Sequence, residues 1–244
     1  MKARIFFIMA ALLAAITTNA KTLVVYYSFT NNVHTIVSDL STQIDADVIR
    51  IEPAEKGIDY AANNYAAGSA LISAILSNPD DAASYPAIDP VEVNMADYDM
   101  VVVAAPLWWS QMAAPLQTFL FQHGKEMADK HIALIVSSAS SGISSVVADA
   151  KRLIPEGNFL EPNLWIRSSQ VSNRHSMIEQ WLKDINYTNI TSSISAVGKD
   201  GEEEALATYN IGGQRIKTDW SNAGISIKQY KKAGMTYSKK YVGR

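Results

Sequence analysis

From Lys21 onward, short apolar runs alternate with segments in which apolar residues recur at helical spacing. A short continuous apolar run is typical of a strand that is buried on both faces. The runs predicted as strands are Leu23–Tyr27, Ala46–Glu52, Met100–Ala105, Ile132–Ser137 and Asn163–Arg167. The helical segments are Val33–Ile44, an Ala-rich stretch ending near Asn78, Ala114–His123, Ser144–Leu153 and Ser176–Ile185. This alternation predicts an α/β fold of three layers, a five-stranded parallel sheet with helices on both faces.

Length and composition narrow the possible functions. The 244 residues suit one elaborated domain or one domain with a small appendage. The absence of cysteine excludes thiolate metal sites, iron–sulfur clusters and cysteine nucleophiles. The formal net charge is −3, so no general attraction to nucleic acid is predicted. The four histidines are scattered without ligand spacing, and no metal site or catalytic Ser/His/Asp set is predicted.

The first twenty residues follow the pattern of a secretory signal. Lys2 and Arg4 precede the apolar run Ile5–Ile16, and small and polar residues follow up to Ala20. We expect cleavage after Ala20 and export of the mature chain to the periplasm or the medium. The alternative is a membrane anchor, but the run is shorter than the ~20 residues that span a bilayer. No stable membrane anchor is therefore expected after cleavage.

In a parallel sheet with helices on both faces, ligands bind beyond the carboxyl ends of the strands. The loops after the first, third and fourth predicted strands are unusual in sequence. Ser28–His34 carries hydroxyl and amide side chains before a helix start, where free N–H groups favour an anion. Ser137–Gly142 is a serine-rich loop that also opens a helix. The alternative for both loops is an ordinary helix cap or turn.

The loop after the third strand, Pro106–Pro115, contains two adjacent tryptophans, Trp108 and Trp109. Adjacent residues cannot both face one core, so at least one indole is expected to form a stacking surface over the cleft. The alternative is that both rings pack beneath the loop.

These three loops, in this order, resemble the flavin-binding loops of the flavodoxin-like superfamily. The closest likeness is to exported bacterial members with a Y-S-x-T-G-N-T loop and a P-x-W-W loop, and it extends from about Thr22 to Ile185. The resemblance implies an FMN-binding protein. It implies that the FMN phosphate is held by Ser28, Thr30, Asn31, Asn32 and Val33. It also implies that the flavin ring is bordered by Pro106, Leu107, Trp108 and Trp109 and by Ser138, Ala139, Ser140, Ser141 and Gly142.

Two residues depart from the family pattern, because Asn31 replaces a glycine and Val33 replaces a threonine. Asparagine tolerates the left-handed backbone conformation, so the turn is expected to survive. Val33 lacks a hydroxyl donor for the phosphate, and the loss of one charge-assisted hydrogen bond lowers affinity by roughly tenfold to a hundredfold. Weakened FMN binding is therefore expected, rather than loss of binding.

Residues 186–244 lie beyond the resemblance and are predicted to form a C-terminal extension. Leu206–Ile211 and Gln214–Thr218, joined by Gly212-Gly213, predict a hairpin. The last segment is predicted to be an amphipathic helix, from the three- and four-residue spacing of Ile227, Tyr230, Gly234, Tyr237 and Tyr241. Its lysines form either a solvated face or a surface for an acidic partner or an anionic membrane.

Two functions remain open at this point. The first is an FMN-dependent electron carrier or oxidoreductase with an unknown redox partner or small-molecule acceptor. The second is an exported flavodoxin-like module that has lost FMN and serves as a non-enzymatic binding protein.

Overall fold

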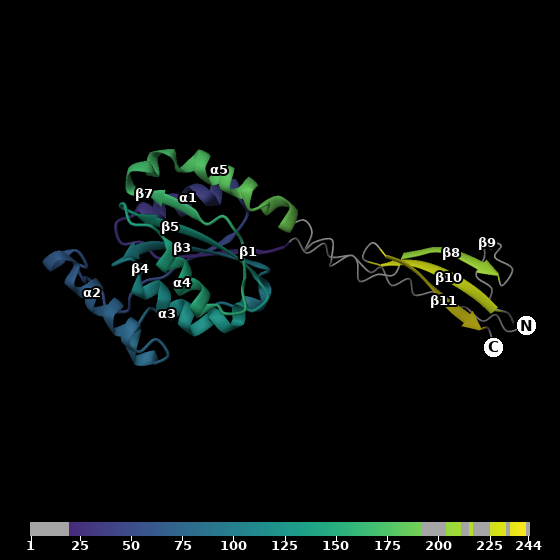
Figure 1. Cartoon of the computed structure of the whole chain (residues 1–244), viewed down its shortest axis with the longest axis horizontal. Coiled ribbons are helices and arrows are strands. Elements are labelled where there is room, and N and C mark those ends of the chain that lie inside the picture. The colour runs from purple at the N-terminus through teal and green to yellow at the C-terminus, as the bar shows by residue number, and fades with distance from the viewer. Residues whose placement is uncertain (1–19, 192–203, 211–214, 217–224, 233–234, 243–244) are drawn as a thin grey trace, which may run out of the picture. The chain divides into compact units, whose positions relative to one another are not determined.

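A computed structural model describes residues 20–191, 204–210, 215–216, 225–232 and 235–242. The chain divides into two compact units, one of residues 20–194 and one that contains the C-terminal strands, and each is described by itself (Figure 1). The segment predicted as a signal peptide lies outside the described residues except for Ala20.

The first unit is built on a parallel sheet in the strand order β2-β1-β3-β5, followed by β6 and β7. These strands are β1 (Thr22–Tyr26), β2 (Asp47–Arg50), β3 (Met100–Trp108), β5 (His131–Ser138), β6 (Asn158–Phe159) and β7 (Leu164–Arg167). The two short strands β6 and β7 pair with the same neighbour, β5, and together form the fifth strand. Pro162 lies between them and has no N–H to donate to a ladder, which accounts for the interruption. The predicted five-stranded parallel sheet is confirmed.

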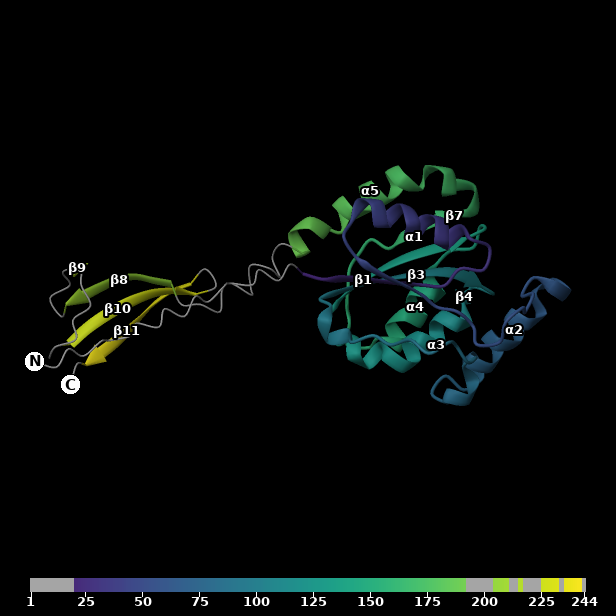
Figure 2. The same ribbon diagram turned by 180° about the vertical axis from the view of Figure 1, so that it is seen from behind.

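Helices cover both faces of this sheet. Helices α1 (Asn32–Gln43) and α5 (Arg174–Asp184) lie on one side, and α3 (Ala114–His123) and α4 (Ser144–Leu153) lie on the other (Figures 1 and 2). Helix α2 (Ala62–Ser77) packs on the side of α3 through Ile72 and Ile75. Short 3₁₀ segments are η1 (Ala82–Ser84), η2 (Met95–Asp97), η3 (Gly124–Met127) and η4 (Ser168–Asn173). The predicted ranges for α3 and α4 match the structure.

The alternation of side chains along the strands divides the core in two. Leu23 and Val25 of β1 belong to the cluster beneath α2, α3 and α4, whereas Val24 and Tyr26 belong to the cluster beneath α1 and α5. All five residues of β1 are buried. A strand with helices on both faces has no polar side, which is why the sequence shows continuous apolar runs.

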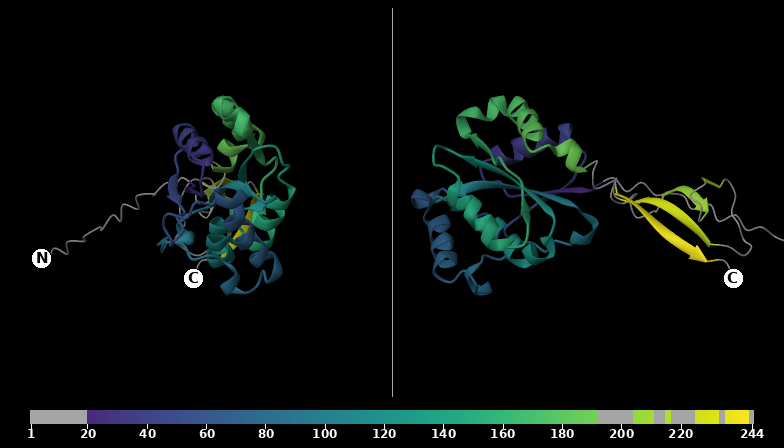
Figure 3. Two further views of the ribbon diagram at one scale, coloured as in Figure 1. Left: turned by 90° about the vertical axis from the view of Figure 1, so that its left-hand side faces the viewer. Right: turned by 45° about the vertical axis from the view of Figure 1, so that its right-hand side comes forward.

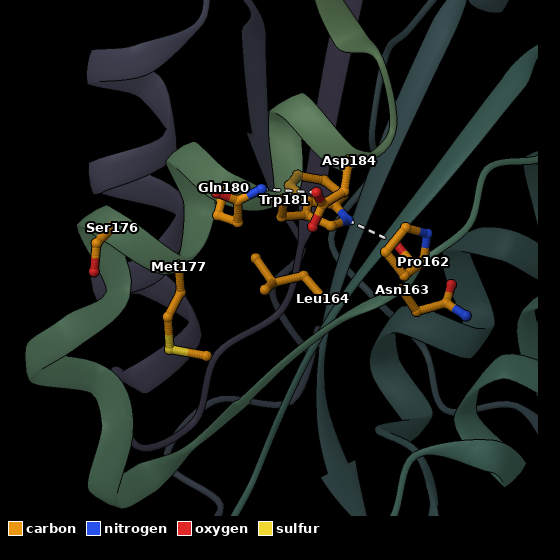
Figure 4. Close-up of a pocket in the computed structure, with 8 residues that line it drawn as sticks. All are labelled: Pro162, Asn163, Leu164, Ser176, Met177, Gln180, Trp181 and Asp184. Carbon is orange, nitrogen blue, oxygen red and sulfur yellow. Dashed lines mark hydrogen bonds between the residues drawn. The ribbon is translucent and has the colours of Figure 1, made fainter.

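Two sets of polar contacts hold α5 in place. The Trp181 indole donates to the Pro162 carbonyl at 2.8 Å and lies beside Leu164 of β7 (Figure 4). On the opposite side, the Asp39 carboxylate of α1 accepts from His175 Nδ1 at 2.8 Å and pairs with Arg174 Nε at 3.2 Å. Desolvation raises the pKa of Asp39, but hydrogen bonds from Gln43 and His175, together with the charges of His175 and Arg174, lower it below its ordinary value. The contacts connect the first helix of the unit to its last.

The C-terminal strands form an antiparallel sheet in the order β11-β10-β8-β9 (Figure 3). They are β8 (Glu204–Asn210), β9 (Arg215–Ile216), β10 (Ile225–Lys232) and β11 (Met235–Val242). The predicted hairpin is confirmed by the pairing of β8 with β9, although its Gly212-Gly213 turn lies outside the described residues.

The predicted C-terminal helix is wrong. Residues Ile225–Lys232 and Met235–Val242 are antiparallel strands, with Tyr230 in register with Tyr237. A spacing of four residues fits a strand of period two as well as a helix, and the isoleucines and tyrosines of this segment favour strands. The extension is therefore a small sheet, and not a hairpin with a helix.

Within the part of the chain that the structure describes, no helix combines the length and the apolar character needed to cross a bilayer.

The packing of α3 against α4 leads to a test of stability. A Cβ atom at Gly124 would overlap the backbone carbonyl oxygen of Leu153, which cannot move without displacing the end of α4. We expect Gly124→Ala to lower the free energy of unfolding by about 1–3 kcal/mol, as overpacking does. The matched control is Gly142→Ala, because no atom lies within 4 Å of a Cβ atom built at Gly142. Urea denaturation of both variants measures the difference, and equal stabilities would contradict this account of the α3–α4 contact.

Candidate functional site

A pocket of about 570 Å³ lies beyond the carboxyl ends of β1, β3 and β5. Eleven of the fourteen predicted site residues line it. They are Ser28, Thr30, Asn32, Val33, Pro106, Leu107, Trp108, Trp109, Ser138, Ala139 and Ser141. The other three predicted residues, Asn31, Ser140 and Gly142, belong to the same loops and are not part of the lining. Three loops that are far apart in the sequence therefore surround one pocket.

The first loop contains a left-handed residue directly before α1. Asn31 has φ 63° and ψ −1°, a conformation that favours glycine and that asparagine tolerates at moderate cost. The first backbone bond of the helix runs from Thr35 N to Asn31 O. The N–H groups of Asn32 and Val33 consequently have no partner within the helix and are available to an anion. The expectation that Asn31 preserves this turn agrees with the backbone.

Ser28 is buried at the base of the same loop. Its Oγ accepts a hydrogen bond from the His34 backbone N–H at 3.1 Å. A hydroxyl has one proton to donate, so accepting this bond leaves the proton of Ser28 free for a group in the pocket. The Arg50 guanidinium donates to the Ser28 carbonyl at 3.2 Å and supports the loop from behind.

The second loop is a tight hairpin between β3 and β4 (Gln111–Met112), with Trp109 and Ser110 as its two central residues. Their φ values are 49° and 67°. Positive φ at both central positions defines a type I′ turn, which usually contains asparagine and glycine. Such conformations cost of order 1–3 kcal/mol each for other residues and persist where the surroundings fix them.

A buried carboxylate fixes this hairpin. Asp149 of α4 is 5% exposed, and its Oδ2 accepts from the Met112 backbone N–H at 2.9 Å. Burial raises the pKa of Asp149, and the bond from Met112 and the nearby Arg152 oppose that rise. Helix α4 thereby holds the strand that follows the two tryptophans.

The two tryptophans have different environments. Trp108 is partly buried and contacts Tyr60 with ring centroids 4.7 Å apart, and it meets Tyr27 edge-on at 5.5 Å. Trp109 is 50% exposed, and its indole N–H donates to the Tyr65 carbonyl at 3.3 Å. One ring therefore packs beneath the loop and the other stands at the mouth of the pocket, as adjacent residues on a turn require.

The third loop is held by serine side chains. The Ser138 hydroxyl donates to the Ser141 carbonyl at 2.9 Å and accepts from the Trp165 indole at 2.8 Å. Asn32 donates to the Ser168 hydroxyl at 3.3 Å, which connects the first loop to the segment after β7. The hydroxyl of Ser138 is thus used within the protein, so this residue can offer a ligand backbone groups more readily than its side chain.

Sequence reasoning missed seven lining residues: Phe29, Tyr60, Tyr65, Gly68, Ser110, Ser137 and Ser168. Phe29, Ser110 and Ser137 adjoin predicted residues in the three loops, and Ser168 directly follows β7. Tyr60 lies just before α2, and Tyr65 and Gly68 belong to its first two turns, where Asn63, Asn64 and Tyr65 all have positive φ. The Asn63-Asn64 pair was the available signal, because asparagine is enriched in this conformation.

The pocket lining carries no formally charged residue among those the structure describes. Burial raises the pKa values of Tyr27 and Tyr60, which keeps both phenols protonated at neutral pH. The site therefore combines backbone N–H groups, hydroxyls and aromatic faces, a set that suits a planar ligand with an anionic end.

A shallower hollow of about 370 Å³ lies between β7 and α5, lined by Leu164, Met177 and Trp181 among others (Figure 4). It lies along α5, away from the three loops. No group of three or more histidine, aspartate or glutamate side chains in the described ranges is arranged to hold a metal ion.

Comparison with solved structures gives the same architecture. A candidate flavoprotein from Bacteroides eggerthii is 23% identical, with a TM-score of 0.56 over 69% of this chain and 99% of that chain. One from Bacteroides uniformis is also 23% identical, with a TM-score of 0.54 over 68% and 99%. A flavoprotein from Lactobacillus acidophilus, solved in complex with FMN, is 21% identical, with a TM-score of 0.50 over 64% and 99%. These similarities establish the fold.

No curated protein matches the chain. The sequence profile of the family described as flavodoxin matches residues 21–185, which is more than half of the chain and includes the three loops of the pocket. The chain therefore belongs to the flavodoxin family.

Proposed function

We propose that this protein binds FMN in the pocket of the three loops and acts in electron transfer or as an FMN-dependent oxidoreductase. The observation that carries the proposal is the meeting of an anion-binding helix start, an aromatic pair and a serine-rich loop around one pocket. Its volume and uncharged, partly aromatic lining fit a flavin. The family match and the FMN complex of the Lactobacillus acidophilus relative support the same ligand.

Different residues would bind the phosphate and the ring system of FMN. The N–H groups of Asn32 and Val33 and the hydroxyls of Ser28 and Thr30 would hold the phosphate. Trp109 would cover one side of the ring system, with the backbone of Ser138–Ser141 along another, and Trp108 would support this wall through its contact with Tyr60. Bound flavin supplies one- and two-electron redox chemistry, and the protein contributes orientation and hydrogen bonding.

The flavin-free binding module remains the second candidate because of Val33. Its side chain is 1% exposed and packs in the core beneath α1. Valine has no hydroxyl at the position where the family has a threonine. A phosphate held without that donor is bound less tightly.

The first prediction concerns the ligand. If the phosphate is held by the first loop, apoprotein should bind FMN at least tenfold more tightly than riboflavin, which lacks the phosphate. Trp109→Ala should lower the affinities for FMN and riboflavin by a similar factor, because the indole would contact the ring that both ligands share. Titration of flavin fluorescence measures all four affinities. Equal affinities of the native protein for FMN and riboflavin would refute the phosphate loop, and no binding of either would favour the flavin-free module.

The second prediction concerns Val33. Val33→Thr should restore a hydroxyl donor and tighten FMN binding about tenfold, with little effect on riboflavin. Val37→Thr is the matched control, because Val37 is 2% exposed, lies one turn later in the same helix and does not line the pocket. Both variants bury a hydroxyl in α1, so unfolding curves should shift alike. If the two changes alter FMN affinity equally, the missing hydroxyl is not the cause of weak binding.

The third prediction concerns location. The basic start, the apolar run and the residues before Lys21 support an exported protein that begins at or near Lys21. Fractionation of the native cells and N-terminal sequencing test this proposal. Native protein that retains Met1 in the cytoplasmic fraction would contradict it.

A further inference from the structure

An uncharged pocket lining presents an electrostatic problem for a phosphorylated ligand. A phosphate monoester carries about −1.5 to −2 charges at neutral pH. The lining offers N–H and hydroxyl dipoles, and no formal positive charge among its described residues. A cation immediately behind the first loop would offset this lack of positive charge.

Arg50 occupies that position. It ends β2 and is in register with Tyr26, two residues before Ser28. Its Nη2 donates to the Ser28 carbonyl at 3.2 Å, so the guanidinium is attached to the loop whose hydroxyl faces the pocket. The guanidinium carbon lies 6.0 Å from the centre of the Tyr26 ring. Tyr26 in turn is bonded through its hydroxyl to His34 Nδ1 at 2.8 Å, which connects this group to the first turn of α1.

A second charge limits what Arg50 can contribute. Its Nε pairs with Glu52 Oε1 at 2.6 Å, and both side chains are more than one third exposed. The carboxylate engages Nε whereas the Ser28 carbonyl accepts from Nη2, so the loop and Glu52 share one guanidinium. Water and Glu52 therefore weaken the field of Arg50 at the loop without removing it.

We propose that Arg50 is a specificity-determining residue that favours phosphorylated over unphosphorylated flavin, and that Glu52 reduces this preference. The inference rests on the proposed function, since it concerns the phosphate end of the same ligand. Arg50 acts through space and through the Ser28 carbonyl. It is not among the described residues that line the pocket, so its removal is not expected to affect the ring that FMN and riboflavin share.

The expected effects have opposite signs for the two residues. Arg50→Gln removes the charge and retains a donor for the Ser28 carbonyl. FMN affinity should then fall about two- to fivefold, the range of a partly exposed ion pair, while riboflavin affinity stays unchanged. Arg50→Lys keeps the charge and should preserve most of the preference. Glu52→Gln removes the competing carboxylate and should raise the affinity for FMN by about twofold to fivefold.

The experiment is a fluorescence titration of the full chain with FMN and with riboflavin at 20 mM and 300 mM NaCl. Lys183→Gln is the control, because it also removes one positive charge from an exposed ion pair, with Glu179 on α5, and leaves the three loops untouched. The ratio of FMN to riboflavin affinity is the readout. A merely structural role of Arg50 would lower both affinities and leave the ratio and its salt dependence unchanged.

The proposal predicts a smaller ratio for Arg50→Gln, a larger ratio for Glu52→Gln, no change for Lys183→Gln, and differences that shrink at high salt. It is overturned if FMN binds and the ratio is the same in Arg50→Gln as in the native protein, or if Glu52→Gln lowers it. If the native chain binds neither flavin, the proposed function fails, and this inference fails with it.

Discussion

The backbone register of β1, β3 and β5 determines where everything else in the site can lie. Tyr26 is paired with Ala104, and Ala104 with Ile135, so these three residues form one row across the sheet. Ser28, Pro106 and Ser137 each lie two residues beyond this row and line the pocket. Because parallel strands direct their carboxyl ends to the same edge, segments separated by about thirty to eighty residues must meet there. The register itself is fixed by burial on both faces, since a shift of one residue would exchange the two halves of the core.

Much of this arrangement follows from local sequence. The ranges of α3 and α4 could be predicted because apolar spacing and strong boundaries coincide there, and the three loops could be found because each follows a buried strand. The contribution of Tyr60 and Tyr65 was missed because it depends on a left-handed turn within an Ala-rich segment, where the Asn63-Asn64 pair was the only local indication. The C-terminal helix was mispredicted for a related reason: Tyr237 and Tyr241 are four residues apart, a spacing that helices and strands share. A four-residue spacing places side chains on one face and does not distinguish a helix from a strand.

Backbone strain is concentrated near the pocket. Six of the eight described non-glycine residues with positive φ lie in its three bordering segments: Asn31, Asn63, Asn64, Tyr65, Trp109 and Ser110. Such conformations are unfavourable for residues with a Cβ, and they survive where surrounding contacts leave no alternative. Asp149 supplies such a contact for the Trp109 hairpin, and the Trp109 indole supplies one for Tyr65. The pocket walls are therefore shaped before any ligand arrives, which reduces the ordering that binding would require.

The interrupted fifth strand has a consequence for the behaviour of the protein at high concentration. A long, continuous edge strand is a template on which a second sheet can grow. Here one edge is divided into pieces of two and four residues with Pro162 between them, and Trp181 lies beside the gap. The other edge, β2, has only four residues and carries Asp47 and Arg50. Neither edge offers a flat apolar row of unpaired N–H and C=O groups, so the unit is protected against fibrous association at both ends of its sheet.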